Sequence, residues 1–431
     1  MSGQADVLAF QQKQRELHEQ CRHPTGEWQP VNWRYPQQSI PHRIAAVAQA
    51  RPDQPAVCDH QTSLTYAQLD QAANQVAHAI LADRGAGQEV VGLLVGVDAT
   101  AVTAALGVLK AGKIYVALEP SFPEKRNLEL LEDAQVNLLL SDERHLAQAQ
   151  RLAGAERQVI QIERLSVGDP RQPELQVPLD ALALINYTSG STSKPKGVVQ
   201  SHRSVLVQAV RYASYYHLTA ADKLAFGGSL AWAASFWVIF GPLCLGSTLA
   251  PFEFRELGME HLVAWLRETE PTMVAGRSLL RQIAAHFPHL RFPSVRAVSM
   301  GGDTIFRQDV EAAMRSFPNA LFTCGYGLSE AGRATQLAFD SPEMIAWDTL
   351  PLGFPEPGVR IQVVAEDGRE VEPGEVGEIV VSDHGLAVGY WRRPEETAAR
   401  FRTGGTPGSI PAYHTGDLGR RTEGGLLHYM G

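Results

Sequence analysis

Uninterrupted apolar runs alternate with segments of helical periodicity through the first three quarters of the chain. VVGLLVGV at residues 90–97 is one such run, and KIYVAL at residues 113–118 is the next. Between them, Val102, Leu106 and Leu109 recur with the period of a helix. A strand with no polar alternation suits a parallel sheet that is covered on both faces, and strand–helix–strand order implies right-handed crossovers. The pattern therefore predicts an α/β fold with a doubly wound sheet.

A second series of the same kind follows in the middle of the chain. Its apolar runs are TMVA at 272–275, VRAVSM at 295–300 and ALFTC at 320–324, with helical segments beginning at Leu279 and Phe306. Each series contains enough strands for a sheet of its own. We therefore predict two doubly wound α/β subdomains.

The pattern changes after about residue 350. VRIQVVAEDGREV alternates apolar and polar residues up to an Asp367-Gly368 turn, which predicts an antiparallel hairpin, and GEIVVS at 377–382 is a further strand. The predicted third part is a small antiparallel, β-barrel-like subdomain. The predicted divisions are an N-terminal extension at 1–41, α/β subdomains at 42–215 and 216–350, and the β subdomain at 351–431.

Composition and charge exclude several classes of protein. The formal net charge is -9, which argues against nucleic acid or an anionic membrane surface as the main partner. The four cysteines show no CxxC spacing, and the first twenty residues lack the pattern of a secretory signal, so we predict a cytoplasmic protein with reduced thiols. Residues 224–252 carry no charge, yet several glycines, Pro242 and three serines interrupt them, which predicts a buried strand, turn and helix rather than a membrane span.

The segment YTSGSTSKPKGVV at 187–199 is the most informative about chemistry. Thr188, Ser189, Ser191 and Thr192 supply hydroxyl donors around Gly190, and lysines follow. Small residues let backbone N–H groups approach phosphate oxygens, and a lysine adds positive charge. The spacing does not fit GxxxxGK[ST], so this is a different phosphate loop from that of P-loop nucleotidases. His202, just beyond it, suits either the site or packing at a helix entry.

This loop resembles the phosphate-loop signature of the acid-activating adenylate-forming superfamily, which includes acyl-CoA synthetases, luciferases and the adenylation domains of nonribosomal peptide synthetases. Five further segments resemble other motifs of that family, in the family's order. They are LTYAQL (64–69), LKAGKIYVALEPSFPEKR (109–126), GYGLSE (325–330), GEIVVSDHGLAVGYWRRPEETAARF (377–401) and YHTGDL (413–418). The chain is identified as a member of this superfamily on these motifs together.

The resemblance implies a two-step reaction that uses ATP and Mg²⁺. ATP and a carboxylic acid give an acyl-adenylate and pyrophosphate, and the acyl group then passes to a thiol. The implied catalytic residues are Thr192, Lys196 and Glu330, with Glu330 as the Mg²⁺ ligand. The implied nucleotide-binding residues are Thr188, Ser189, Gly190, Ser191, Thr192, Gly302, Asp303, Thr304, Tyr326 (stacked on adenine), Gly327, Ser329 and Asp417 (at the ribose).

The resemblance also implies an acid pocket that departs from the pattern of amino-acid-activating relatives. The implied lining residues are Trp232, Ala233, Ala234, Trp237, Ala275, Ser299, Gly301, Gly325, Arg333 and Ala334. Amino-acid-activating relatives carry an aspartate for the substrate ammonium where Ala233 stands. A buried ammonium without a counter-ion is strongly disfavoured, so we expect a keto, hydroxy, aryl or acyl acid. Arg333 either holds a carboxylate, keto or hydroxyl oxygen of the acid or points outward.

The family's mobile C-terminal lid would begin where the sequence stops, at HYMG. Without that lid we expect slow adenylate formation and no thioester formation. The leading hypothesis is an adenylation domain that loads the phosphopantetheine thiol of a carrier protein. The alternatives are the core of an acyl- or aryl-CoA synthetase and, from another class, a non-catalytic module that binds a nucleotide or an acyl group.

Overall fold

The computed structural model describes residues 4–21, 23–28, 31–32, 36–165, 168–188, 195–253, 257–402 and 410–431. Seven of the described strands form one sheet, in the order β20-β8-β7-β4-β3-β5-β6. They are β3 (Val90–Leu94), β4 (Ile114–Ala117), β5 (Leu138–Ser141), β6 (Gln158–Gln161), β7 (Leu182–Thr188), β8 (Lys196–Ser201) and β20 (Gly389–Tyr390). The strands from β7 to β6 are parallel, whereas β8 and β20 run antiparallel to their neighbours.

A second sheet contains nine of the described strands, in the order β17-β16-β13-β12-β11-β9-β10-β1-β2. Its parallel centre consists of β1 (Pro55–Cys58), β9 (Lys223–Phe226), β10 (Thr248–Pro251), β11 (Met273–Ala275), β12 (Ala297–Gly301) and β13 (Leu321–Gly325). Antiparallel strands extend both edges: β2 (Ser63–Thr65) at one, β16 (Thr335–Phe339) and β17 (Phe354–Pro355) at the other.

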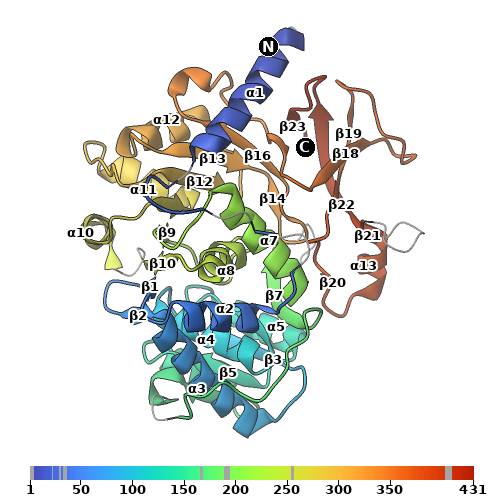
Figure 1. Ribbon diagram of the computed structural model, residues 1–431. Coiled ribbons are helices and arrows are strands. Elements are labelled where there is room, and N and C mark those ends of the chain that lie inside the picture. Colours follow the sequence, from blue (N-terminus) through green and yellow to red (C-terminus); the bar gives the residue numbers. More distant parts are fainter. Residues whose placement is uncertain are drawn as a thin grey trace.

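Helices cover both faces of both sheets, as a doubly wound fold requires (Figure 1). Within β3, Val91 and Leu93 belong to one apolar cluster, whereas Val90 and Leu94 belong to another that packs on the opposite face. The outer helices are α5 (Glu124–Ala134) and α6 (Leu146–Ala153) on the seven-stranded sheet, and α10 (Met259–Thr269), α11 (Arg277–His286) and α12 (Arg307–Ser316) on the nine-stranded sheet. Because successive side chains of a strand point to opposite faces, an unbroken apolar run is what two covered faces demand.

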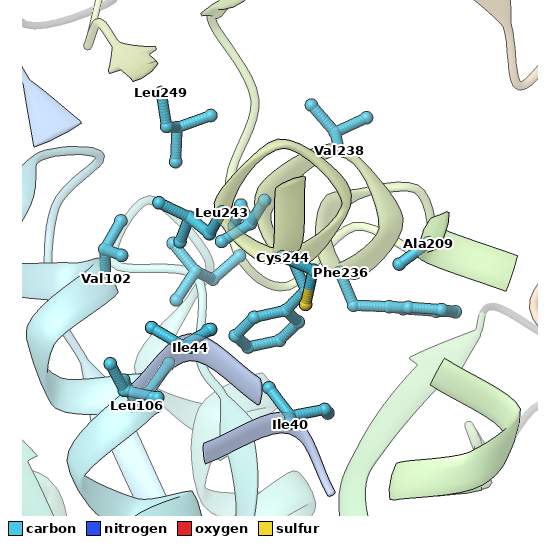
Figure 2. Close-up of a cluster of buried hydrophobic side chains, with 14 of the residues drawn as sticks. Ile40, Ile44, Val102, Leu106, Ala209, Phe236, Val238, Leu243, Cys244 and Leu249 are labelled. Carbon is cyan, nitrogen blue, oxygen red and sulfur yellow. The ribbon is translucent and has the colours of Figure 1, made fainter. Parts of the chain in front are cut away.

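The largest apolar cluster lies between the two sheets. It is built from α2 (Ile40–Ala50), α3 (Tyr66–Arg84), α4 (Ala99–Lys110), α7 (His202–Tyr215) and α8 (Ser235–Leu245). Figure 2 shows Phe236 and Leu243 of α8 beside Ile40 and Ile44 of α2 and Leu106 of α4. Strands of both sheets contribute to the same cluster, so this layer fixes how the two sheets sit relative to each other.

The last part of the chain forms a curled antiparallel sheet. Its described strands are β18 (Arg360–Val364), β19 (Val376–Ser382), β21 (Phe401–Arg402), β22 (Ala412–Arg421) and β23 (Leu427–Tyr429), and α13 (Pro394–Arg400) packs beside it. In Figure 1 this sheet stands to one side of the two α/β layers, coloured red. A separate two-stranded ribbon, β14 (Gly327–Leu328) with β15 (Gly332–Arg333), lies between the nine-stranded sheet and this one.

The predicted fold class is confirmed, and the predicted strands of both parallel series are present. Strands that were not predicted include β1, β2, β8, β10, β16 and β22. Strand pairing also crosses the predicted divisions, since β1 and β2 join the second sheet and β20 joins the first. The predicted divisions at 41, 215 and 350 therefore do not separate the strands of one sheet from those of another, and as domain boundaries they remain predictions.

The N-terminal helix α1 (Gln4–Gln20) packs along β16. The side-chain amide of Gln14 donates to the Ala338 carbonyl oxygen at 2.9 Å and accepts from the Ala338 N–H at 2.7 Å. A single side chain therefore satisfies both polar backbone groups of a residue on this strand.

The charge-free stretch at 224–252 contains the predicted strand and helix, β9 and α8, followed by a second strand, β10, that was not predicted. Its side chains fill the layer between the sheets, where Phe236, Phe240 and Leu243 are fully buried. In the part of the chain that the structure describes, no helix has the length and apolar character needed to cross a membrane.

His202 begins α7, directly after a capping box in which Ser201 and Ser204 exchange hydrogen bonds. The ring is fully buried, and neither nitrogen has a partner among the described residues. Burial, reinforced by His42, lowers the pKa of His202 from 6.5 to about 3. The structure thus favours packing at the helix entry over a role in the site.

This burial predicts a pH-dependent stability. Below pH 6.5 the unfolded chain binds a proton at this position that the folded chain does not, so stability is fully present above that pH and falls towards pH 3. Below pH 6.5, His202 makes the free energy of unfolding fall by about 1.4 kcal/mol for each pH unit. The free energy of unfolding, measured in urea at several pH values between 4.5 and 7.5, should therefore change less with pH in His202→Leu than in the wild type. His289→Leu, at an exposed position, should keep the wild-type slope; an unchanged slope in His202→Leu would contradict the assignment.

Candidate active site

The strands β7 and β8 flank the phosphate-loop segment. They pair antiparallel, and the last pair in the register is Thr188 with Lys196. Ser189, Gly190, Ser191 and Thr192 lie outside the described residues. Antiparallel pairing therefore sets Thr188, the last residue of β7, beside Lys196, the first residue of β8.

Lys196 is held at that position by an acidic partner. Its Nζ lies 2.7 Å from Oε2 of Glu396, a residue of α13, and 5.7 Å from the centre of the Tyr390 ring. The side chain is 22% exposed, so it reaches solvent. A lysine in this position would supply a point charge for phosphate oxygens.

Glu330 lies beside the hydroxyl groups of two tyrosines. The Tyr390 hydroxyl donates to Glu330 Oε1 at 2.9 Å and lies 3.0 Å from the Tyr413 hydroxyl. Burial, and next the neighbouring Glu330, raise the pKa of both tyrosines, so both hydroxyls remain protonated donors. Glu330 itself is 9% exposed, and one of its carboxylate oxygens accepts the hydrogen bond from Tyr390. The resulting arrangement is an oriented carboxylate, which is what a metal ligand requires.

The nucleotide-binding candidates Tyr326 and Asp417 are brought together across the β subdomain. The Tyr326 hydroxyl donates to Asp417 Oδ2 at 2.5 Å, and burial followed by this carboxylate raises the pKa of the phenol. The Asp417 backbone N–H donates to Thr415 Oγ1 at 3.0 Å, which fixes the turn that presents the carboxylate. A flat ring and an anchored carboxylate thus lie next to each other.

The Gly302–Thr304 stretch follows β12 and is held by one arginine. Arg277 Nη2 lies 2.6 Å from Asp303 Oδ2, and its Nη1 donates to the Thr304 carbonyl oxygen at 2.8 Å. Gly302 has a φ of +89°, a conformation that glycine adopts without strain. Of the remaining candidates, Gly327 lies in β14, and the Ser329 carbonyl oxygen accepts from Gln200 Nε2 at 2.7 Å.

The acid-pocket candidates on the nine-stranded sheet meet at the carboxyl ends of its central strands. Ala275 pairs with Ser299, and Gly301 pairs with Gly325, across β11, β12 and β13. This is the edge at which open α/β sheets bind ligands. A side chain at Gly325 would collide with the Thr335 carbonyl oxygen, so the close approach of these backbones requires glycine there.

The other acid-pocket candidates divide between two surroundings. Trp232, Ala233 and Ala234 are half-buried in the turn that enters α8, whereas Trp237 and Ala275 pack in the core between the sheets. Ala334 is fully buried and packs on the side of the β subdomain. The backbone of Ala334 accepts from the Glu356 N–H at 3.0 Å and donates to the Tyr326 carbonyl oxygen at 2.9 Å.

Arg333 of β15 points inward, and only 8% of the residue is exposed. Its Nη1 donates to the Tyr216 hydroxyl at 2.7 Å and to Ser299 Oγ at 3.4 Å, and its Nε lies 2.9 Å from Glu356 Oε1. Of the two orientations left open for this arginine, the structure therefore shows the inward one. It also brings the side chain to Ser299, a second predicted pocket residue.

Several residues around the site were not among the candidates from the sequence. Tyr390, Tyr413 and Glu396 lie inside the recognised segments GYWRRPEE and YHTGDL, but a sequence alone does not tell which member of a motif supports another. Glu356, between two prolines in FPEPG, and Arg211, in the middle of α7, give no signal at all. Their positions follow only from the approach of α7 to the chain around β15.

The residues present suit a magnesium ion that arrives with phosphate. Mg²⁺ commonly keeps several waters and takes one or two carboxylates together with phosphate oxygens. The oriented carboxylate of Glu330 would be such a ligand, and the bound ion would neutralise charge on the phosphates. Within the described ranges, no group of three or more His, Cys, Asp or Glu side chains is placed to hold a metal without phosphate.

Comparison with known proteins gives one answer at the level of family. The AMP-binding enzyme family matches residues 44–391. A component of the linear gramicidin synthase of Brevibacillus parabrevis is 32% identical over 419 residues, which cover 94% of this chain and 8% of that component. Tyrocidine synthase 2 of the same organism is 29% identical over 404 residues, which cover 91% of this chain and 11% of that protein. The chain thus spans about a tenth of the length of these relatives.

Solved structures agree with this result. The crystal structure of the nonribosomal peptide synthetase FmoA3 is 27% identical, with a TM-score of 0.83 over 97% of this chain and 44% of FmoA3. The N-terminal subdomain of Klebsiella oxytoca NpsA shares the fold, with a TM-score of 0.78 and 23% identity over 92% of this chain and 100% of that one. Fold and site together define an acid-activating adenylate-forming enzyme core. The chain belongs to the AMP-binding enzyme family, as an AMP-forming ligase of the adenylation-domain class.

The hydrogen bond from the Tyr390 hydroxyl to Glu330 leads to a testable prediction. Removing the Tyr390 hydroxyl frees one carboxylate oxygen and loosens its orientation, and loss of such a supporting bond typically weakens metal affinity about 10- to 100-fold. Titrating Mg²⁺ against ATP binding by calorimetry should therefore show a higher half-saturating Mg²⁺ concentration for Tyr390→Phe. The exposed Tyr429→Phe should match the wild type. An unchanged Mg²⁺ requirement in Tyr390→Phe would contradict the role of Glu330 as the metal ligand.

Proposed function

We propose that this chain activates a carboxylic acid without a free α-amine as its acyl-adenylate, for transfer to the phosphopantetheine thiol of a carrier protein. The observation that carries the proposal is the charge of the acid pocket. Ala233 stands where an ammonium would need a carboxylate, and the cation Arg333, which is paired with Glu356, reaches Ser299. A substrate ammonium would therefore find no carboxylate at Ala233 and would lie near a positive charge.

The proposed roles are those that the resemblance to the family implies, and the contacts of the site are compatible with them. Tyr326 would lie against the adenine, and Asp417 would accept hydrogen bonds from the ribose hydroxyls. The phosphate loop and Lys196 would hold the phosphates, with Glu330 as ligand of the magnesium ion. Attack of a substrate carboxylate on the α-phosphate needs little proton transfer, so alignment and neutralisation of charge supply most of the catalysis.

The proposed acceptor rests on the kind of protein that this chain resembles. FmoA3 is a nonribosomal peptide synthetase, and one structural neighbour is an artificially fused adenylation–PCP di-domain of NpsA and ThdA. Synthetase relatives cover 88% or more of this chain. These likenesses favour a carrier protein over free CoA as the thiol partner.

Thermal stabilisation by non-hydrolysable acyl-sulfamoyl-adenosines tests the substrate class directly. The ligands are used in pairs that differ only in an α-amino group. At 100 times its Kd a ligand adds about 2.7 kcal/mol to the stability, which is a readable shift in melting temperature. The deamino member of each pair should stabilise the chain and the aminoacyl member should not. A larger shift with the aminoacyl members would overturn the proposal.

A charge substitution gives the converse test. Ala233→Asp would place a carboxylate where an ammonium could pair with it, so the aminoacyl members should gain affinity relative to the deamino members by tenfold or more. Ala231→Asp adds the same charge two residues earlier, outside the predicted pocket, and should leave the ratio unchanged. Isothermal calorimetry with one matched pair of analogues measures both variants.

A further inference from the structure

Four buried ionisable side chains form one cluster behind the acid pocket. Arg211 Nη1 lies 2.7 Å from Asp383 Oδ2, and Arg211 Nε lies 3.2 Å from Glu356 Oε2. The other oxygen of Glu356 lies 2.9 Å from Arg333 Nε. All four side chains are less than a tenth exposed. With two cations and two anions, the cluster is neutral as a whole, and Glu356 connects its two arginines.

Arg333 is the member of the cluster that faces the pocket. Three phenol rings surround its guanidinium group, with ring centres 5.4 to 5.7 Å from Cζ. Tyr212 and Tyr215 lie in α7, and Tyr216 directly follows that helix. Burial alone would lower the pKa of Arg333, but Tyr216, Glu356 and Tyr212 outweigh it and the pKa lies above its ordinary value. The arginine therefore stays charged, and Glu356 is the anion that balances it.

The pocket side of Arg333 carries hydroxyl groups rather than free charge. Nη1 contacts the Tyr216 hydroxyl and Ser299 Oγ, and Nη2 lies 3.4 Å from Thr323 Oγ1. Ser299 and Thr323 are register partners on β12 and β13, close to the strand ends. The Ser299 and Thr323 contacts are long, so their donors can turn to a better acceptor. We call Arg333, Ser299 and Thr323 the wall of the pocket. The wall can donate hydrogen bonds through Arg333, whose charge is paired with Glu356.

We propose that the activated acid is uncharged apart from its reacting carboxylate and carries a hydroxyl or keto oxygen that bonds to Arg333 and Ser299, and that Glu356 is the positioning residue that sets this preference. This rests on the function proposed above and specifies its substrate class. A second carboxylate would add an unbalanced negative charge beside a neutral buried cluster, which is strongly disfavoured. An acid without an acceptor would leave Nη2 of Arg333 with only its long contact to Thr323, and Nη1 with its long second contact to Ser299.

Glu356→Gln and Asp383→Asn form a matched pair of variants. Each removes one negative charge from the cluster with little change of volume. In Glu356→Gln the unbalanced cation is Arg333, at the pocket, whereas in Asp383→Asn Arg333 keeps Glu356 and the imbalance lies at Arg211. Glu356→Asp retains the charge. Net charge is therefore the same in the first two variants, and only its position differs.

The ligands are acyl-sulfamoyl-adenosines of equal chain length whose acyl groups bear a hydroxyl, a carboxylate or a methyl group on the same carbon. The wild type, measured by calorimetry, should bind the hydroxy member at least tenfold more tightly than the carboxylate member and several-fold more tightly than the methyl member. Glu356→Gln should reverse the order of the hydroxy and carboxylate members. Asp383→Asn and Glu356→Asp should keep the wild-type order.

Each outcome bears on the proposal. A wild type that prefers the carboxylate or the methyl member overturns it without any variant. A folded Glu356→Gln protein, with unchanged affinity for AMP but wild-type order, overturns the role of Glu356. The proposed function itself fails separately, when aminoacyl analogues bind more tightly than all three deamino ligands. If Glu356→Gln does not fold, the double variant Arg333→Met, Glu356→Gln decides: loss of the preference for hydroxyl over methyl supports the wall, and its retention overturns it.

Discussion

The apolar layer between the two sheets is the constraint on which the rest of the molecule depends. The helices α2, α4, α7 and α8 bury their side chains against strands of both sheets in one continuous cluster. Such interiors are packed as densely as organic crystals and do not deform smoothly. The ends of β7 and β8 in one sheet and the carboxyl ends of β11, β12 and β13 in the other are therefore held in a fixed relation.

The helix α7 shows how this layer connects packing to chemistry. It begins at the buried His202, directly after β8 and the phosphate loop, and it ends in the tyrosines that enclose Arg333. Between these ends, Arg211 forms ion pairs with Glu356 and Asp383, and all three side chains are buried. One helix thus connects the end of β8 with the surroundings of Arg333, and its apolar residues face the core.

The sequence predicts what depends on local pattern. Unbroken apolar runs at 90–97 and 113–118 predict parallel strands because only such strands are covered on both faces, and short motifs mark Lys196, Glu330, Tyr326 and Asp417. What escapes prediction is the pairing of distant residues. β16 lies antiparallel beside β13 although nothing in its sequence sets its direction, and Glu356 reaches Arg333 through a loop whose path depends on tertiary structure. Burial of a charged residue is decided by its partner, which a one-dimensional pattern does not name.

The contact between α1 and β16 has a consequence for how the domain behaves in solution. β17 covers only the first residues of β16, so the polar backbone of Ala338 would lie open if the Gln14 amide did not occupy it. An open strand edge is a template on which a second polypeptide can add a strand. The N-terminal helix, which precedes the region matched to the family, therefore covers this edge, and a fragment that begins at α2 would leave the two backbone groups of Ala338 open to a second polypeptide.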